Sequence, residues 1–512
     1  MMASVRRRFA FTLGANLLRS LLGFTTGMLL ARWLGPESYG NMAFLLGTFL
    51  GIRQLLDMGS SAAFFTFLSQ RPRSRKFVRQ FFAWLAVQFL IPLCVVGLLF
   101  PSQWIETIWH GEQRSLVLLA FAAAFMQNSV WPVVQQAGES QRQTVWVQGV
   151  GVVVVGAHLL AVILLWQLGI LGLYAIFAAI ALEYLLAAVV VHRRFQYAPG
   201  SEVDSIDDAL KPMLRKYLDY CLPLMPYAWI SCAYELTDRW LLQNYGGSVE
   251  QAYYAVGSQF AAIALIATSS ILRIFWKEIA EAHHQGNHVR TGMLYQKVSR
   301  LLFLVGAMIS GFLIPWAEGL LHLILGAAYV GGATTLAIMF LYPIHQSMGQ
   351  IGGTMLYATE RVSIQVVAGI AFMIVSMGVT YLVLAPGDAV VPGLGLASEG
   401  LALKMVVLQI IQVNIIAYII AHIWKWPFDW AYQPVSLLGC VGLGWGIHYT
   451  VTGFVGQAWS LIIVMGLGGV LYLMLMVAFV YTMPWLVGMT RDELVLDTGK
   501  VLRKTIGGFK LK

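Results

Sequence analysis

Long apolar stretches follow one another along the chain, from near residue 9 to near residue 480. A helix needs about 20 mostly apolar residues to cross the hydrocarbon core of a bilayer. Single apolar runs of this length are not the short, alternating strands of a membrane barrel. The pattern therefore predicts an all-α integral membrane protein with about 14 transmembrane helices, at residues 9–31, 39–62, 77–100, 115–137, 144–166, 170–191, 217–243, 251–272, 299–316, 333–358, 361–385, 396–423, 435–453 and 457–481.

Positive charge is sorted between the two sides that these helices define. If the N-terminus is cytoplasmic, the inside segments hold 27 of the 33 Lys and Arg residues, and the outside gaps hold only Arg32 and Arg114. Such an asymmetry is what the positive-inside rule produces. We therefore expect a multi-pass protein with both termini in the cytoplasm.

The composition excludes several other classes of protein. With 59% hydrophobic and 11% charged residues, and a mean hydropathy of +0.72, the chain is too apolar for an ordinary soluble protein. The net charge of +9 does not indicate nucleic-acid binding, because the basic residues lie beside segment ends, where they meet anionic lipid headgroups. The four cysteines show no metal-ligand spacing, and His158 and His345 are interpreted as packing residues, so we expect no disulfide, metal or cofactor.

The longest cytoplasmic connection, residues 193–216, contains a proline, a glycine and four acidic residues, which is typical of a solvated linker. It divides the chain into an N-terminal six-helix lobe at 1–192 and a C-terminal six-helix lobe at 217–424. The remaining residues, 425–512, are predicted to form two extra helices and a cytoplasmic tail.

A weak internal repeat agrees with this division. The turn at 137–139 recurs at 358–360, a shift of 221 residues, and the same shift carries Gly172 onto Gly393. Two halves with the same orientation form a parallel repeat, as in many transporters. We therefore expect two pseudo-symmetric lobes around a central cavity.

Short motifs in the first ten predicted helices resemble one family of transporters. They are Ala31-Arg32-Trp33-Leu34-Gly35-Pro36-Glu37-Ser38-Tyr39-Gly40 with Asp57-Met58-Gly59, then Leu222-Pro223 with Asp238-Arg239 and Ala252-Tyr253-Tyr254, and Leu325-Gly326-Ala327-Ala328-Tyr329. In these motifs the chain resembles the polysaccharide-export (O-antigen) flippases of the multidrug/oligosaccharidyl-lipid/polysaccharide exporter superfamily, called the MOP superfamily.

The resemblance implies a flippase and not an enzyme. Such a protein would move an undecaprenyl-diphosphate-linked oligosaccharide from the inner to the outer leaflet of the bacterial inner (plasma) membrane, for synthesis of O-antigen, capsule or exopolysaccharide. The implied partners are this lipid-linked oligosaccharide, membrane lipids, and a polysaccharide polymerase and chain-length regulator. No cofactor is implied.

Charged residues within apolar segments are the candidate site residues, because a charge at mid-membrane costs about 2.5–3.5 kcal/mol on insertion scales. Arg19 and Arg53 are predicted to face a cavity and bind the diphosphate, since the guanidinium fork binds two phosphate oxygens at once. Alternatively, Asp57 neutralises Arg53, because positions i and i+4 share a helix face. Asp57 is also a candidate for ion coupling, although a neighbouring Arg53 favours its charged form.

The other candidates are two pairs of charges. Glu183 and Lys404 are related by the shift of 221 residues, so they are predicted to form a cross-lobe pair or separate structural ties, with Lys404 as a third cavity cation. Asp238 and Arg239 are adjacent, and adjacent helical residues point about 100° apart. Each therefore needs its own partner, and the two are candidates for membrane-interface anchoring or for an outer gate.

Other functions remain open on the sequence alone. A lipid II flippase also needs cations for a diphosphate, and an ion-coupled multidrug antiporter belongs to the same superfamily. An O-antigen polymerase or ligase would be expected to carry a large outside loop with catalytic Arg or His, and the outside gaps here are short. A structural scaffold would have little use for buried charge.

Overall fold

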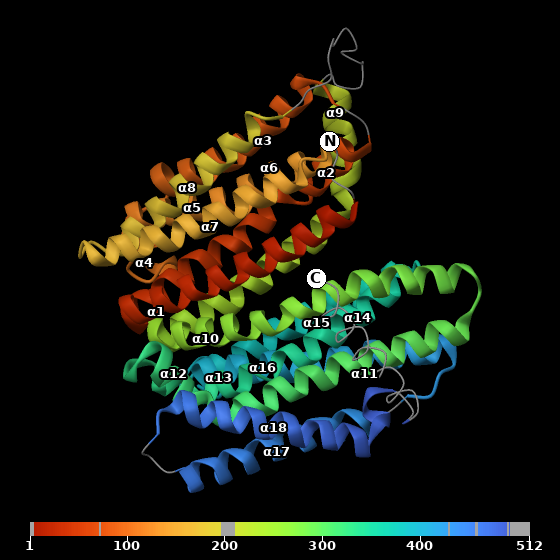
Figure 1. Ribbon diagram of the computed structural model, residues 1–512. Coiled ribbons are helices and arrows are strands. Elements are labelled where there is room, and N and C mark those ends of the chain that lie inside the picture. Colours follow the sequence, from red (N-terminus) through yellow and green to blue (C-terminus); the bar gives the residue numbers. More distant parts are fainter. Residues whose placement is uncertain are drawn as a thin grey trace, which may run out of the picture. The chain divides into compact units, whose positions relative to one another are not determined.

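The chain folds almost entirely into helices (Figure 1). The computed structural model describes residues 5–70, 73–195, 210–428, 431–455, 459–488 and 491, and those ranges contain no strand. Within them, eleven helical stretches are long and apolar enough to cross a membrane. The all-α fold class is confirmed, whereas the number of 14 crossings stays a prediction.

The chain divides into two compact units, and each is described here by itself. The first unit comprises residues 1–256 and 370–401, and the second comprises residues 257–369 and 402–512. The predicted boundaries at 192, 216 and 424 stay a prediction. Of the predicted linker, residues 196–209 lie outside the described residues, and α9 begins at Leu210.

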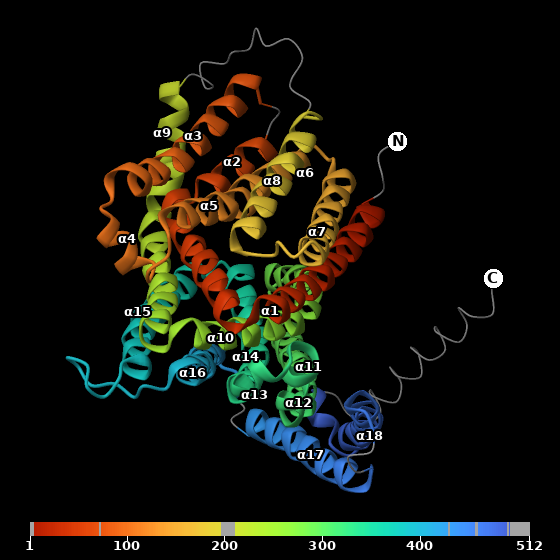
Figure 2. The same cartoon turned by 90° about the vertical axis from the view of Figure 1, so that its left-hand side faces the viewer.

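In the first unit, α1 packs along α7 and against α5, while α8 packs against both α5 and α7 (Figure 2). Its helices are α1 (Val5–Asp57), α2 (Ser60–Gln70), α3 (Arg75–Cys94), α4 (Ser102–Ile108), α5 (Arg114–Phe125), α6 (Trp131–Ser140), α7 (Thr144–Gln167), α8 (Leu173–His192), α9 (Leu210–Cys221), the first part of α10 (Met225–His284), most of α15 (Val362–Leu384) and the start of α16 (Ala397–Trp424).

In the second unit, α11 packs against α14 and α17, and α17 packs against α18. The helices that begin in this unit are α11 (His288–Leu313), α12 (Ala317–Leu325), α13 (Ala333–Met339), α14 (Tyr342–Ala358), α17 (Tyr432–Val455) and α18 (Leu461–Thr482). Phe303 and Ile344 share an apolar core with Cys440 and Tyr472. The last two helices are thus part of this unit's core.

Two long helices are each bent at a glycine. Within α1, Gly35 has φ 75° and ψ 169°, and within α10, Gly247 has φ 79° and ψ −178°. This backbone region is essentially restricted to glycine. The kinks separate residues 9–31 from 39–62 and residues 217–243 from 251–272, as the apolar pattern predicts. One continuous helix therefore contains two predicted crossings.

The two kinked helices meet closely inside the first unit. A Cβ added to Gly40 would lie 1.7 Å from the carbonyl oxygen of Ser248, so only glycine allows this approach. Beside it, Ser248 and Gln243 both donate hydrogen bonds to the side-chain oxygen of Asn41. Further along the same seam, Gly47 faces Arg239 and Gly51 faces Glu235.

The internal repeat is visible in two helix turns. After α6, the amides of Gln141, Arg142 and Gln143 donate to the carbonyls of residues 137, 139 and 138. After α14, residues 359, 360 and 361 donate to residues 355, 357 and 356 in the same order, and Arg142 and Glu360 both have φ 61°. These turns are related by 218 residues, not by 221. The predicted shift is wrong at this turn because it matched Glu139, inside α6, with a residue of the second turn itself.

Candidate functional site

Arg19 lies in a polar network that joins three helices of the first unit. Its Nη2 donates to Asn16 Oδ1 in α1 and, over 2.8 Å, to Gln148 Oε1 in α7. Gln148 Nε2 in turn donates to Glu139 Oε1 in α6 over 2.6 Å. A single amide therefore connects the guanidinium to a carboxylate, and the pair of charges sums to zero.

The neighbouring helix is shaped to receive this arginine. A Cβ at Gly151 would lie 2.8 Å from Arg19 Nη1, so the absence of a side chain there leaves room for the guanidinium. Gln148 is only 3% exposed, and both ends of its amide are hydrogen-bonded. Arg19 is thus held in place and electrically compensated.

Arg53 has a different environment in the same helix. Its side chain is half-buried, and the structure gives it no hydrogen bond or ion pair with any other described residue. The predicted pairing with Asp57 does not form as an ion pair between these two described residues. Asp57 Oδ1 instead accepts hydrogen bonds from Ser60 Oγ at 3.0 Å, from the Ser61 amide at 2.9 Å and from Ser61 Oγ at 2.6 Å.

The role of Asp57 follows from its position in the chain. It is the last residue of α1, and α2 begins at Ser60, whose first turn presents amides without helical partners. A carboxylate at that point satisfies an amide and interacts favourably with the helix dipole. Arg53 is left as a cation whose charge Asp57 offsets only at a distance.

Glu183 forms a contact within its own unit. Its Oε2 lies 2.8 Å from His158 Nδ1, between α8 and α7. Lys404 belongs to the second unit, where it is 2% exposed in α16 and its Nζ lies 3.8 Å from Met405 Sδ. The pairing of Glu183 with Lys404 stays a prediction.

Asp238 and Arg239 have separate partners, as their 100° offset requires. Thr380 Oγ1 of α15 donates to Asp238 Oδ1 over 2.6 Å, and Asp238 is 6% exposed. The Arg239 guanidinium lies 5.4 Å from the centre of the Tyr254 ring. Eight residues separate Arg239 from the Gly247 kink, so it does not sit in the last turn of a helix.

Sequence reasoning missed the residues that complete these contacts as partners. Gln148 and Glu139 are polar residues in or beside strongly apolar helices, which is the signal that could have identified them. Asn16, three residues before Arg19, is a second such signal.

Comparisons with known proteins identify the family. The family model described as "Polysaccharide biosynthesis protein" matches residues 5–276, which is more than half of the chain. The chain therefore belongs to the polysaccharide biosynthesis protein family. No curated protein matches it.

Solved structures share the fold. The lipid II flippase MurJ in an inward closed conformation has 14% identity and a TM-score of 0.67, and the match covers 92% of this chain and 99% of that one. An inward-facing multidrug resistance MATE family transporter of the MOP superfamily has 14% identity and a TM-score of 0.60, over 80% and 96% of the two chains. The predicted resemblance to MOP-superfamily polysaccharide flippases is confirmed.

Proposed function

We propose that this member of the polysaccharide biosynthesis protein family is a flippase for a lipid-linked oligosaccharide. It carries an undecaprenyl-diphosphate-linked glycan from the inner to the outer leaflet of a bacterial inner membrane, with both termini in the cytoplasm. It acts as a transporter and not as an enzyme. The glycan then enters O-antigen, capsule or exopolysaccharide synthesis, where a polymerase and a chain-length regulator are the partners.

Arg53 is the observation that carries this proposal. A cation within a membrane-spanning helix is costly unless it has a partner or water, and the structure gives Arg53 no hydrogen-bonded or ion-paired partner among the described residues. A diphosphate is the kind of group that a guanidinium binds in bidentate fashion. We therefore assign the substrate diphosphate first to Arg53, with Lys404 as a second candidate cation.

Transport would proceed by alternating access between the lobes at 1–192 and 217–424. The seam between the second half of α1 and the first part of α10 contains Asp238 and Arg239, which we propose as residues of the outer gate. Glycines along the α1 side of that seam allow close packing, and close packing can be separated without breaking many hydrogen bonds.

The test is deletion of the gene followed by complementation. A deletion strain should lose surface glycan and accumulate the lipid-linked oligosaccharide on the cytoplasmic side, and the full chain should restore both. Purified protein in liposomes should then move the lipid-linked oligosaccharide between leaflets. Accumulation of the lipid-linked oligosaccharide on the outer side in the deletion strain would contradict the proposal, because it would place the defect after translocation.

Lipid II is the second candidate substrate, because the fold match to the lipid II flippase covers nearly the full length of both chains. Expression of this chain in cells depleted of their own lipid II flippase separates the two. Rescue of growth would favour lipid II, and failure to rescue growth together with restored surface glycan in the deletion strain would favour the oligosaccharide. An ion-coupled multidrug antiporter would do neither and would instead raise drug tolerance.

A further inference from the structure

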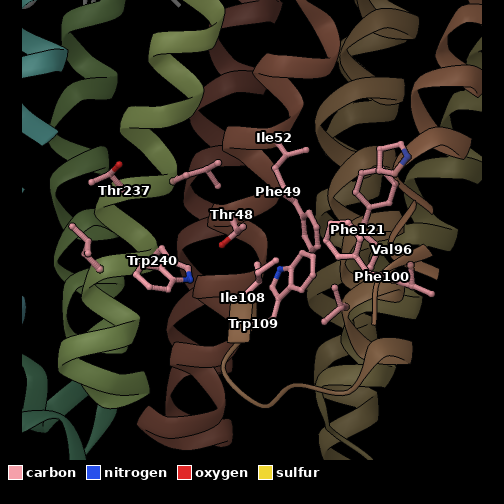
Figure 3. A pocket seen from close by; sticks show the side chains of 15 residues that line it. Thr48, Phe49, Ile52, Val96, Phe100, Ile108, Trp109, Phe121, Thr237 and Trp240 are labelled. Atoms are coloured by element: carbon pink, nitrogen blue, oxygen red, sulfur yellow. The ribbon is translucent and has the colours of Figure 1, made fainter. Parts of the chain in front are cut away.

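The first unit contains an apolar cavity of about 510 Å³ that no part of the proposed transport cycle uses. It lies among α1, α3, α4, α5 and α10, and Figure 3 shows Trp109 between the side chains of α10, Thr237 and Trp240, and those of Val96, Phe100 and Phe121. This volume is within the range of small-molecule sites. It is formed by membrane-spanning helices, so lipid is the surrounding solvent.

The cavity is held open by contacts outside its lining. Arg114 donates hydrogen bonds to the carbonyls of Gly97, over 2.9 Å, and Phe100, over 2.7 Å. These bonds fix the turn that follows α3 and carries Val96 and Phe100. The cavity wall is therefore a built feature and not a gap between loosely packed helices.

One polar group in the wall lacks a hydrogen-bond partner. Trp109 is 3% exposed, and its indole Nε1 is buried without an acceptor. The two threonines of the lining are satisfied, because Thr48 donates to the Phe44 carbonyl and Thr237 donates to the Ala233 carbonyl, each over 2.7 Å. Leaving a buried donor unpaired costs about 1–3 kcal/mol, so an occupant that accepts from Trp109 would recover that energy.

The lining also limits the charge of the occupant. No charged side chain lines the cavity within the described residues. A diphosphate or other dianion would need cations there, so the acceptor must be neutral. A neutral oxygen next to a long hydrocarbon chain is what the ester of a diacyl glycerophospholipid provides.

We propose that this cavity binds one acyl chain of a membrane glycerophospholipid, whose ester carbonyl accepts a hydrogen bond from Trp109 Nε1. The chain lies against the aromatic rings of Phe49, Phe121 and Trp240. The bound lipid fills the space between α10 and the helices α3 to α5. This site is separate from Arg53, so it does not depend on the proposed transport function.

Native mass spectrometry of the full-length protein tests the proposal. The protein is purified in mild detergent and incubated with equal amounts of a diester phosphatidylglycerol and its diether analogue, which lacks the carbonyls. The wild type should retain the diester about fivefold more than the diether, the value expected for one hydrogen bond. Trp109→Phe should retain the two lipids equally, because it keeps an aromatic ring and loses the donor.

Matched variants separate this site from the rest of the lipid-facing surface. Trp104→Phe changes a 56% exposed tryptophan of the same short helix and should behave as the wild type. Val96→Trp should fill the cavity and remove the retained lipid, whereas Leu98→Trp, at a position 80% exposed, should not.

Three results would overturn the proposal. The first is equal retention of diester and diether lipids by the wild type. The second is undiminished retention by Val96→Trp, and the third is displacement of the phospholipid by added undecaprenyl diphosphate, which would assign the cavity to a prenyl chain.

Discussion

The two buried arginines of α1 lie on opposite sides of the Gly35 kink and have opposite environments. Arg19 reaches two helices through Gln148 and Glu139, and its guanidinium is fixed by two hydrogen bonds. Arg53 has no hydrogen bond or ion pair among the described residues. The first arrangement compensates a charge and ties helices together, and the second leaves a cation available for an anionic ligand.

The difference separates structural from functional charge. A compensated arginine is already desolvated and partnered, so binding a phosphate there would require breaking the bonds that hold it. An unpartnered arginine loses only its water on binding. We therefore expect Arg53 to affect transport and Arg19 to affect mainly stability.

The largest expected effect is the loss of transport in Arg53→Gln. Removing a charged group that binds the diphosphate should lower the rate of translocation at least tenfold, since hydrogen bonds to charged groups are worth about 1.5–3 kcal/mol. Flipping of the lipid-linked oligosaccharide in liposomes measures the rate. Arg53→Lys should keep part of the activity, because it keeps the charge and loses the fork.

The outcome against this prediction is also defined. If Arg53→Gln with Asp57→Asn is active while both single variants are inactive, the two residues act as a mutually neutralising pair, since a lone buried charge is worse than none. Arg53 would then have no substrate-binding role.

The second effect concerns Arg19 and Glu139. Arg19→Gln and Glu139→Gln each leave one charge uncompensated and should destabilise the protein by about 1–3 kcal/mol. The double variant should cost less than the sum of the two singles. Thermal unfolding in detergent measures this coupling, and strictly additive effects would show that Gln148 does not link the two charges.

The third effect tests the kink between the two arginines. Gly35→Ala places a side chain at φ 75° and ψ 169°, which costs about 1–3 kcal/mol. Gly23→Ala, in the same helix with nothing within 4 Å of the added Cβ, is the matched control and should be neutral or slightly stabilising. Equal melting temperatures for the two variants would mean that the kink relaxes at no cost.

The sequence predicted much of the fold but little of the pairing. Apolar length alone located the crossings, because lipid demands it, and it separated the two halves of α1 on either side of Gly35. The candidate cations were also visible, since charge is rare in apolar runs. Their partners were not visible, because Glu139 lies 120 residues from Arg19 and meets it only through α7.

Two further differences have the same origin. Glu183 was matched with Lys404 by a repeat shift, while His158, on the next helix, provides its observed contact. Asp57 was assigned to Arg53 by helical spacing, but α1 ends at Asp57, and the carboxylate turns to the next helix. Spacing rules hold within a helix and do not describe its ends or its neighbours.

The smallest expected effect is that of Asp57, the residue nearest Arg53 in the comparison. If its carboxylate serves the start of α2, then Asp57→Asn should be nearly neutral in stability, because Asn caps a helix as well as Asp does, and Asp57→Ala should cost about 1 kcal/mol. Both variants should keep translocation, since Arg53 retains its charge. Melting temperature and flipping rate, measured on the same preparations, provide the two readouts. Loss of translocation in Asp57→Asn with an unchanged melting temperature would contradict the capping role and would make Asp57 a candidate for ion coupling instead.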